Sequence, residues 1–281
     1  MAILPAVPAF STAVIVNGEP ADEYQPPDIP IPYDTEFEGV PRTRCFIPAE
    51  TGNTYSVRFR LSPRFDFGIE TDTLLVAIYI DGALVEETIV YKELLREQDF
   101  IDHIKYRHQQ YADGSLTSHE FCFRDLAPAE CTSAVTLNAD MQLVKTLGTI
   151  RVVLKLAKNF GKDPSAHPGL GEEISGSLEP SCKALALNGH GQTHGTDYME
   201  VDVDVPIVYY AIDIRDTIGC FDFVYLSPDT LKLQGILDPK FINQAAQGMP
   251  QTIEPAPEPP RYGIRTLSNG CLEIDLTGDD E

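Results

Sequence analysis

The segment around Asp81-Gly82 limits the fold of this 281-residue chain more strongly than any other. Two apolar runs, Leu74 to Ile80 and Leu84 to Val90, flank this dipeptide, which readily adopts the positive φ angles of a tight primed turn. The pattern predicts a β-hairpin. From residue 10 to about residue 157, apolar residues mostly recur at every second position, and turn-forming residues interrupt them at short intervals. This periodicity is typical of an antiparallel sandwich or barrel.

We therefore predict a mainly β fold, an antiparallel, jelly-roll-like β-sandwich with a few short helices and a disordered C-terminal tail. Further strands are expected over residues 10–16, 43–47, 55–61, 118–123, 149–156, 198–214 and 221–225. Ser227-Pro228-Asp229 is a good helix start, with proline in the first turn, so a short helix is expected up to about Gly235. A helical turn is expected near residues 241–246.

Proline and glycine divide the chain into segments. Residues 17–42 are expected to form a long ordered loop or an edge of the sheet, and residues 159–180 an irregular excursion from the domain, since their prolines and glycines oppose central strands. Five prolines between Pro250 and Pro260 indicate a linker that cannot bury enough surface to become ordered. The predicted organisation is a β-sandwich over residues 1–238, a helical turn and proline-rich linker over 239–261, and a flexible acidic tail over 262–281.

The charge of the chain restricts its partners. A formal net charge of -22 opposes binding to phosphate backbones and anionic membranes, so we expect no direct contact with nucleic acid and none with a membrane. The sequence shows no export signal and no apolar run of membrane-spanning length. Its six cysteines are scattered without a CxxC spacing, which predicts neither a zinc site nor a disulfide framework. We expect an intracellular protein, nuclear or cytoplasmic, without a cofactor.

Several short blocks of the sequence carry a family resemblance: Met1 to Pro5, Val57 to Arg60, Ile78 to Gly82, Thr193 to Thr196, and Phe223 to Ser227. Together they resemble an uncharacterised fungal family that consists of a domain of unknown function. The resemblance covers roughly residues 1–238, implies a fungal β-sandwich-like domain and supplies no catalytic residues. Leu226 stands where that family usually has Arg, and residues 187–190 stand where it tends to be basic, which argues against an anion site there.

The segment Gly189 to Gly195 has two functional interpretations, a phosphate-binding loop or a metal site formed by His190 and His194. Its glycine spacing is one residue longer than the dinucleotide fingerprint. Its glycines also oppose the helix that would bring both histidines to one face, and Asp197 or a remote residue would have to supply a third ligand. We favour a flexible loop in which His194 forms local hydrogen bonds, and we expect no metal.

Six polar side chains are candidates for a catalytic group: Asp102, His103, His108, Ser115, Ser118 and His119. The chain lacks a Gly-x-Ser-x-Gly turn, a paired-carboxylate signature and a zincin motif. Distant residues can still form an active site, so an enzyme with a dispersed site remains an alternative hypothesis.

The end of the chain resembles the SUMO-interacting motif, whose core is hydrophobic-acidic-hydrophobic-Thr beside acids. The matching residues are Ile274, Asp275, Leu276 and Thr277, followed by Asp279, Asp280 and Glu281, and Leu272 can extend the contact. In this mode an extended peptide adds a strand to the partner's sheet, and acids meet a basic rim. Phosphate on Thr277, which precedes acids, would add about two negative charges.

We therefore expect a non-enzymatic adaptor that binds SUMO or a SUMO-modified protein. An acidic chaperone-like protein that shields basic partners such as histones is the main alternative, because the net charge alone would favour it.

Overall fold

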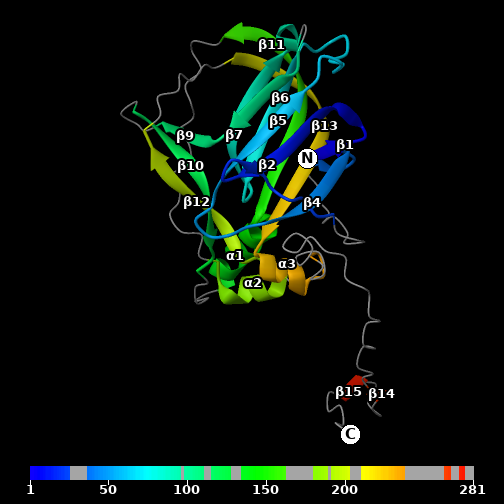
Figure 1. Cartoon of the computed structure of the whole chain (residues 1–281), viewed down its shortest axis with the longest axis vertical. Helices are drawn as coiled ribbons and strands as arrows, with labels where there is room; N and C mark the ends of the chain where they lie inside the picture. The colour runs from blue at the N-terminus through cyan, green and yellow to red at the C-terminus, as the bar shows by residue number, and fades with distance from the viewer. Residues whose placement is uncertain are drawn as a thin grey trace, which may run out of the picture. The chain divides into compact units, whose positions relative to one another are not determined.

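The computed structural model describes residues 1–25, 37–95, 98–110, 115–127, 134–162, 180–188, 191–202, 210–237, 263–266 and 272–275. The chain forms two compact units, Met1–Pro239 and Lys240–Glu281, and the first of them is a β-sandwich (Figure 1).

Two sheets make up the first unit. The eight-stranded sheet has the central order β1-β2-β5-β10-β12, and its strands are β1 (Ala2–Leu4), β2 (Val7–Val16), β3 (Glu19–Pro20), β5 (Thr54–Leu61), β8 (Phe100–Ile104), β9 (Tyr106–Gln110), β10 (Leu116–Asp125) and β12 (His194–Val201). The five-stranded sheet has the order β4-β13-β11-β6-β7, with β4 (Arg42–Pro48), β13 (Tyr210–Leu226), β11 (Thr149–Lys162), β6 (Thr73–Ile80) and β7 (Ala83–Tyr91). The predicted mainly β sandwich is confirmed. The second sheet is mixed, because β4 and β13 run parallel.

The hairpin predicted around Asp81-Gly82 is confirmed. Asp81 and Gly82 have φ angles of 52° and 85°, as a primed two-residue turn requires, and Ile80 pairs with Ala83 on either side of the turn.

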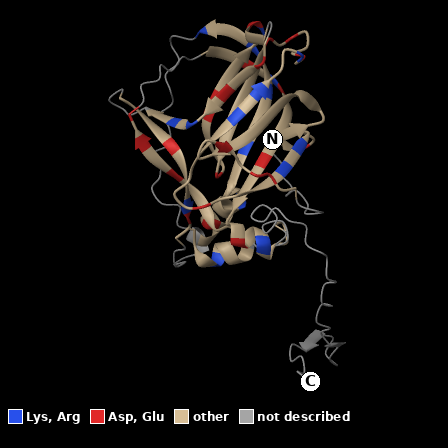
Figure 2. Cartoon of the chain, viewed as in Figure 1, with Lys and Arg blue, Asp and Glu red and all other residues tan. Residues whose placement is uncertain are grey.

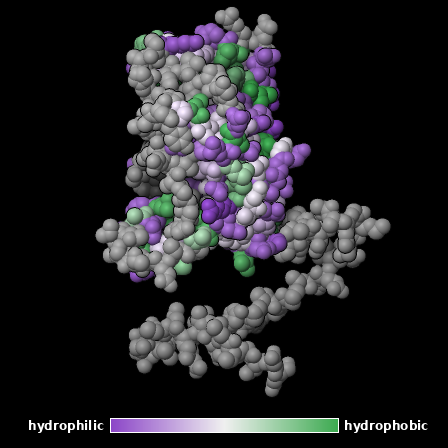
Figure 3. Space-filling model, turned by 90° about the vertical axis from the view of Figure 1, so that its left-hand side faces the viewer, coloured by the Kyte–Doolittle hydropathy of each residue, from purple (hydrophilic) through white to green (hydrophobic). Residues whose placement is uncertain are grey.

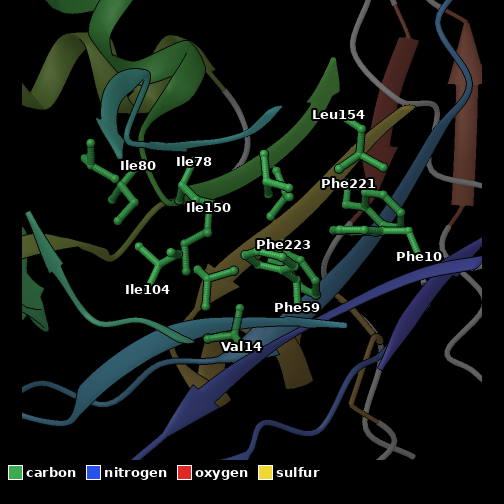
Figure 4. Close-up of a cluster of buried hydrophobic side chains, with 14 of the residues drawn as sticks. Phe10, Val14, Phe59, Ile78, Ile80, Ile104, Ile150, Leu154, Phe221 and Phe223 are labelled. Carbon is green, nitrogen blue, oxygen red and sulfur yellow. The ribbon is translucent and has the colours of Figure 1, made fainter. Parts of the chain in front are cut away.

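Alternation along the strands produces the core between the sheets. Phe10 of β2 lies 5.7 Å from Phe59 of β5 and 5.4 Å from Phe221 of β13, measured between ring centroids, so the rings of both sheets meet (Figure 4). Phe223 and Ile150 are fully buried beside them. Because every second residue points inward, each strand contributes a row of apolar side chains to one core.

Helices gather at one end of the sandwich (Figure 1): α1 (Ala134–Thr146), α2 (Cys182–Asn188) and α3 (Pro228–Leu233), while η2 (Lys92–Leu95) is a short 3-10 helix. The helix predicted after Ser227 is confirmed as α3, and the Ser227 hydroxyl caps it by accepting a hydrogen bond from the backbone N–H of Thr230 at 3.2 Å. Among the described residues, every helix is too short or too polar to cross a membrane.

Both segments expected to be irregular contain strand residues in their described parts. Strand β11 continues to Lys162, so residues 159–162 are strand, and β3 lies within the loop expected at 17–42. The helical turn expected at residues 241–246 lies outside the described residues.

The face of the sandwich in Figure 3 carries polar and apolar residues interspersed.

The second unit contains an antiparallel pair of strands, β14 (Gly263–Thr266) and β15 (Leu272–Asp275). Ile264 lies opposite Ile274, and Gly263 lies opposite Asp275.

Candidate functional site

The residues expected to bind a partner begin in strand β15. Leu272, Ile274 and Asp275 have the extended backbone that strand addition requires, and β14 occupies one edge of their strand. The remaining expected partner-binding residues lie outside the described residues: Leu276, Thr277, Asp279, Asp280 and Glu281.

His194 is not part of a loop, so the flexible-loop interpretation is wrong for this residue. It begins strand β12 and is 4% exposed. Its Nδ1 lies 2.8 Å from the Thr193 hydroxyl, and its Nε2 lies 3.2 Å from Asp125 Oδ1 and 3.3 Å from the Thr51 hydroxyl. Burial lowers the pKa of His194, and the charge of Asp125 opposes this shift. Both ring nitrogens therefore have protein partners.

No metal site is built around it in the described part of the chain. There, no group of three His, Cys, Asp or Glu residues is placed to hold a metal ion. His190, the other histidine considered as a ligand, lies outside the described residues.

The carboxylate of Asp81 is the centre of a buried hydrogen-bond network. Oδ1 accepts from the backbone N–H of Gly148 and from the Tyr225 hydroxyl, both at 2.7 Å, and Oδ2 accepts from the backbone N–H of Thr196 at 2.9 Å. The Thr196 hydroxyl lies 2.6 Å from the Tyr55 hydroxyl and 2.9 Å from that of Tyr225. We call these five residues the Asp81 network.

The environment of this network makes it a structural anchor. Burial raises the pKa of Asp81, while hydrogen bonds from Tyr225, Thr196 and Gly148 oppose the shift. Burial, together with the nearby carboxylate, also raises the pKa of the Tyr55 and Tyr225 hydroxyls well above the ordinary value. Both hydroxyls therefore stay protonated. The Asp81 network holds the turn between β6 and β7 of the five-stranded sheet against strands of both sheets.

Three of the sequence blocks that carry the family resemblance meet here, since they contribute Asp81, Thr196 and Tyr225. The backbone N–H of Ser227 also donates to the Thr193 hydroxyl at 3.0 Å, which joins the last two blocks directly. In the sequence, Asp81 is recognisable only as a turn residue. The presence of Thr and Tyr in the other blocks was the available signal that these blocks meet in space.

The side chains considered for catalysis are not assembled into one site. His108 of β9 lies opposite Ser118 of β10, with Nδ1 2.9 Å from the hydroxyl, but Ser118 is 1% exposed and a substrate cannot reach it. His119 is the next residue of the strand and so points to the other face. Asp102 of β8 accepts a hydrogen bond from the backbone N–H of His103 at 2.8 Å. The arrangement is that of separate structural contacts.

A second buried carboxylate ties three strands of the five-stranded sheet together. Asp222 of β13 accepts hydrogen bonds from Arg42 Nε of β4 at 2.6 Å and from Arg151 Nε of β11 at 2.8 Å. Arg151 also lies over the ring of Phe37, 5.2 Å from its centroid. Basic bands on β4 lie beside an acidic band on β13 in Figure 2. This cluster stabilises the parallel pairing of β4.

In a comparison with known protein families, residues 9–240 match a family that is described as a domain of unknown function, DUF7918. Neither the curated proteins nor the solved structures give a match.

Proposed function

We propose that this chain, which belongs to the DUF7918 family, is a non-enzymatic interaction protein whose C-terminal tail binds SUMO or a SUMO-modified protein by strand addition. In this proposal the protein is an adaptor in the nucleus or cytoplasm of a fungal cell. Ile274 and Leu276 anchor the peptide, and the acids from Asp275 to Glu281 supply charge that complements a basic rim.

The observation that supports this proposal is the extended backbone of β15. Strand addition needs a segment that is extended and has an edge available for hydrogen bonds. In β15 one edge pairs with β14, and within the described residues the opposite edge pairs with no strand. A partner sheet can therefore extend the pair to three strands without first breaking it.

The test is a calorimetric titration of the full chain with SUMO. We expect a dissociation constant of roughly 1–50 μM, because a short strand buries little surface on binding. Changing Ile274→Ala together with Leu276→Ala should abolish binding. Ile253→Ala with Leu267→Ala is the matched control, since it truncates two aliphatic residues outside the motif and should leave the affinity unchanged. Equal binding by both double variants, or no binding by the native chain, would remove the proposal.

Phosphorylation and salt provide two further measurements. A phosphate on Thr277 should tighten binding, and equal affinities with and without it would contradict the role given to tail charge. The acidic chaperone alternative predicts histone binding that survives deletion of residues 262–281 and falls steeply with salt. The tail proposal predicts loss of SUMO binding on the same deletion.

A further inference from the structure

A cavity of about 700 Å³ opens in the first unit beside the start of β4. Its walls combine polar and apolar surface in nearly equal shares and come from five segments, which contribute the apolar side chains of Val7, Ala9, Val40, Phe65 and Ile218 among others. This volume falls within the range of roughly 300–1,000 Å³ that is typical of ligand sites.

The cavity lies beside the part of β13 whose second edge has no partner strand among the described residues. Strand β4 pairs with β13 only from Cys220 to Leu226, whereas β11 pairs with β13 along its whole length from Tyr210. In the part of the chain that the structure describes, no strand pairs with the second edge of β13 before Cys220. Residues 216–218 of this unpaired part line the cavity, and so do residues 39–41, which directly precede β4. We call this cavity the β4 gap.

Two register shifts interrupt the pairing of this part of β13 with β11. Ile218 and Arg215 have no opposite residue on β11, because the register shifts by one residue at each of them. Such bulges bend a strand and redirect its side chains. Gly219 follows at once, and a Cβ there would lie 3.0 Å from Leu4 Cδ2, so β1 packs directly against the strand at the edge of the β4 gap.

The rim of the β4 gap is acidic. Glu38, Asp66 and Asp216 line it with a single basic residue, Arg64, and all four are exposed. Among the described residues none of the three carboxylates forms an ion pair, although Asp66 accepts a hydrogen bond from the backbone N–H of Gly68 at 2.8 Å. Three carboxylates against one guanidinium favour a cationic group in the ligand.

We propose that the β4 gap binds a short extended segment of a partner protein, in which basic side chains alternate with apolar ones, by adding it as a strand to the free edge of β13. Three residues of such a segment span about 10 Å. The backbone would pair with β13 in line with β4, apolar side chains would fill the cavity, and basic side chains would reach Asp66 and Asp216. This site belongs to the first unit and does not depend on the tail.

The test uses the full chain and an end-blocked, fluorescein-labelled peptide, Val-Arg-Val-Arg-Val, in a fluorescence anisotropy titration at physiological salt. We expect saturable binding, and no binding of the matching Val-Glu-Val-Glu-Val peptide. A third peptide keeps the arginines and carries N-methyl groups at alternate residues. Because it cannot donate strand hydrogen bonds, it should bind at least 10-fold more weakly.

Two pairs of substitutions locate the site. Asp66→Asn with Asp216→Asn should weaken binding about 5-fold, as the loss of two exposed ion pairs predicts. Glu19→Gln with Glu50→Gln removes the same charge at exposed positions outside the gap and should change affinity less than about 2-fold. Ala6→Phe, at an exposed turn position that lines the cavity, should block binding by filling it.

Several results would overturn the proposal. Equal weakening by the two acid pairs would show attraction to the net charge alone. Undiminished binding of the N-methylated peptide would show a site for amphipathic cations without strand addition. Absence of peptide binding would refute the site itself. The Ile274→Ala, Leu276→Ala variant should bind the peptide normally, so failure here and failure of SUMO binding are separate results.

Discussion

Replacing Asp81 by Asn tests the role of the Asp81 network with almost no change of shape. Asn tolerates the positive φ of 52° at this turn position, so the backbone is not strained by the substitution. The change removes one acceptor oxygen and puts an NH₂ group in its place. Oδ1 of Asp81 accepts from the backbone N–H of Gly148, and Oδ2 accepts from that of Thr196. Either orientation of the Asn amide therefore places its NH₂ group against one of these backbone N–H groups, so that two donors face each other.

The size of the effect follows from burial. A hydrogen bond to a charged group contributes about 1.5–3 kcal/mol, and a buried donor without an acceptor costs about 1–3 kcal/mol. Part of this loss is offset because the variant no longer buries a charge. We expect a net destabilisation of about 3 kcal/mol, which for a unit of this size lowers the melting temperature by about 6–12 °C.

The assay is thermal unfolding of the full chain followed by circular dichroism. Asp99→Asn is the control, because Asp99 forms an exposed ion pair with Arg60 and should contribute less than about 1 kcal/mol. Tyr225→Phe completes a double-mutant cycle with Asp81→Asn, and we expect a coupling energy above about 1 kcal/mol. A melting temperature for Asp81→Asn that matches the Asp99→Asn control would refute the network as an anchor.

Two further predictions concern the turn and a buried acid. Gly82→Ala should destabilise the protein by about 2–4 kcal/mol in chemical denaturation, because Gly82 has a φ of 85° and an added Cβ would lie 2.8 Å from the Cβ of Thr146. The control is Gly18→Ala, which should cost only about 1 kcal/mol, since Gly18 has a φ of 89° and open space around it. Equal losses of stability in the two variants would contradict the contact between the turn and α1. Burial, and then the charges of neighbouring acids, raises the pKa of Glu86 from 4.5 to about 7. The contribution of the Glu86 carboxyl to the stability of the fold is therefore present below about pH 4.5 and is lost as pH rises through about 7. From about pH 5.5 to about pH 8 the free energy of unfolding of the native chain, measured in urea, should therefore fall by about 1–2 kcal/mol relative to that of Glu86→Gln. Parallel pH profiles of stability for the two proteins would show that the pKa of Glu86 is not raised.

Local chemistry explains which elements could be predicted. The β6–β7 hairpin depends on a turn dipeptide and on alternation within one short window, and both are visible in the sequence. Helix α3 was likewise visible, because Ser227 and Pro228 mark its start.

Elements that depend on distant partners were missed. Helix α1 contains the β-branched residues Val135, Thr136, Val144 and Thr146, which lower helix propensity. Its position depends on tertiary contacts: Val144 is fully buried, and the Thr146 hydroxyl donates to the carbonyl of Asp81. The parallel pairing of β4 with β13 is also nonlocal and leaves no local pattern.

The candidate sites divide in the same way. The partner-binding role of the tail stays a prediction from its alternating apolar and acidic residues, of which Leu272 to Asp275 form a strand. The Asp81 network and the β4 gap were not predicted, because each brings together segments far apart in the sequence.

The span of the Asp81 network constrains how the protein can be made on a ribosome. Asp81 is separated from Thr196 by 115 residues and from Tyr225 by 144 residues. At about 5–20 residues per second, Tyr225 is synthesised about 7–30 s after Asp81. At the start of that interval none of the donors to the Asp81 carboxylate has been synthesised; Gly148 follows first, then Thr196 and last Tyr225, and β4 has no partner strand until β13 is made. The sandwich therefore closes only when synthesis has passed residue 226, and its edges need protection from other chains until then.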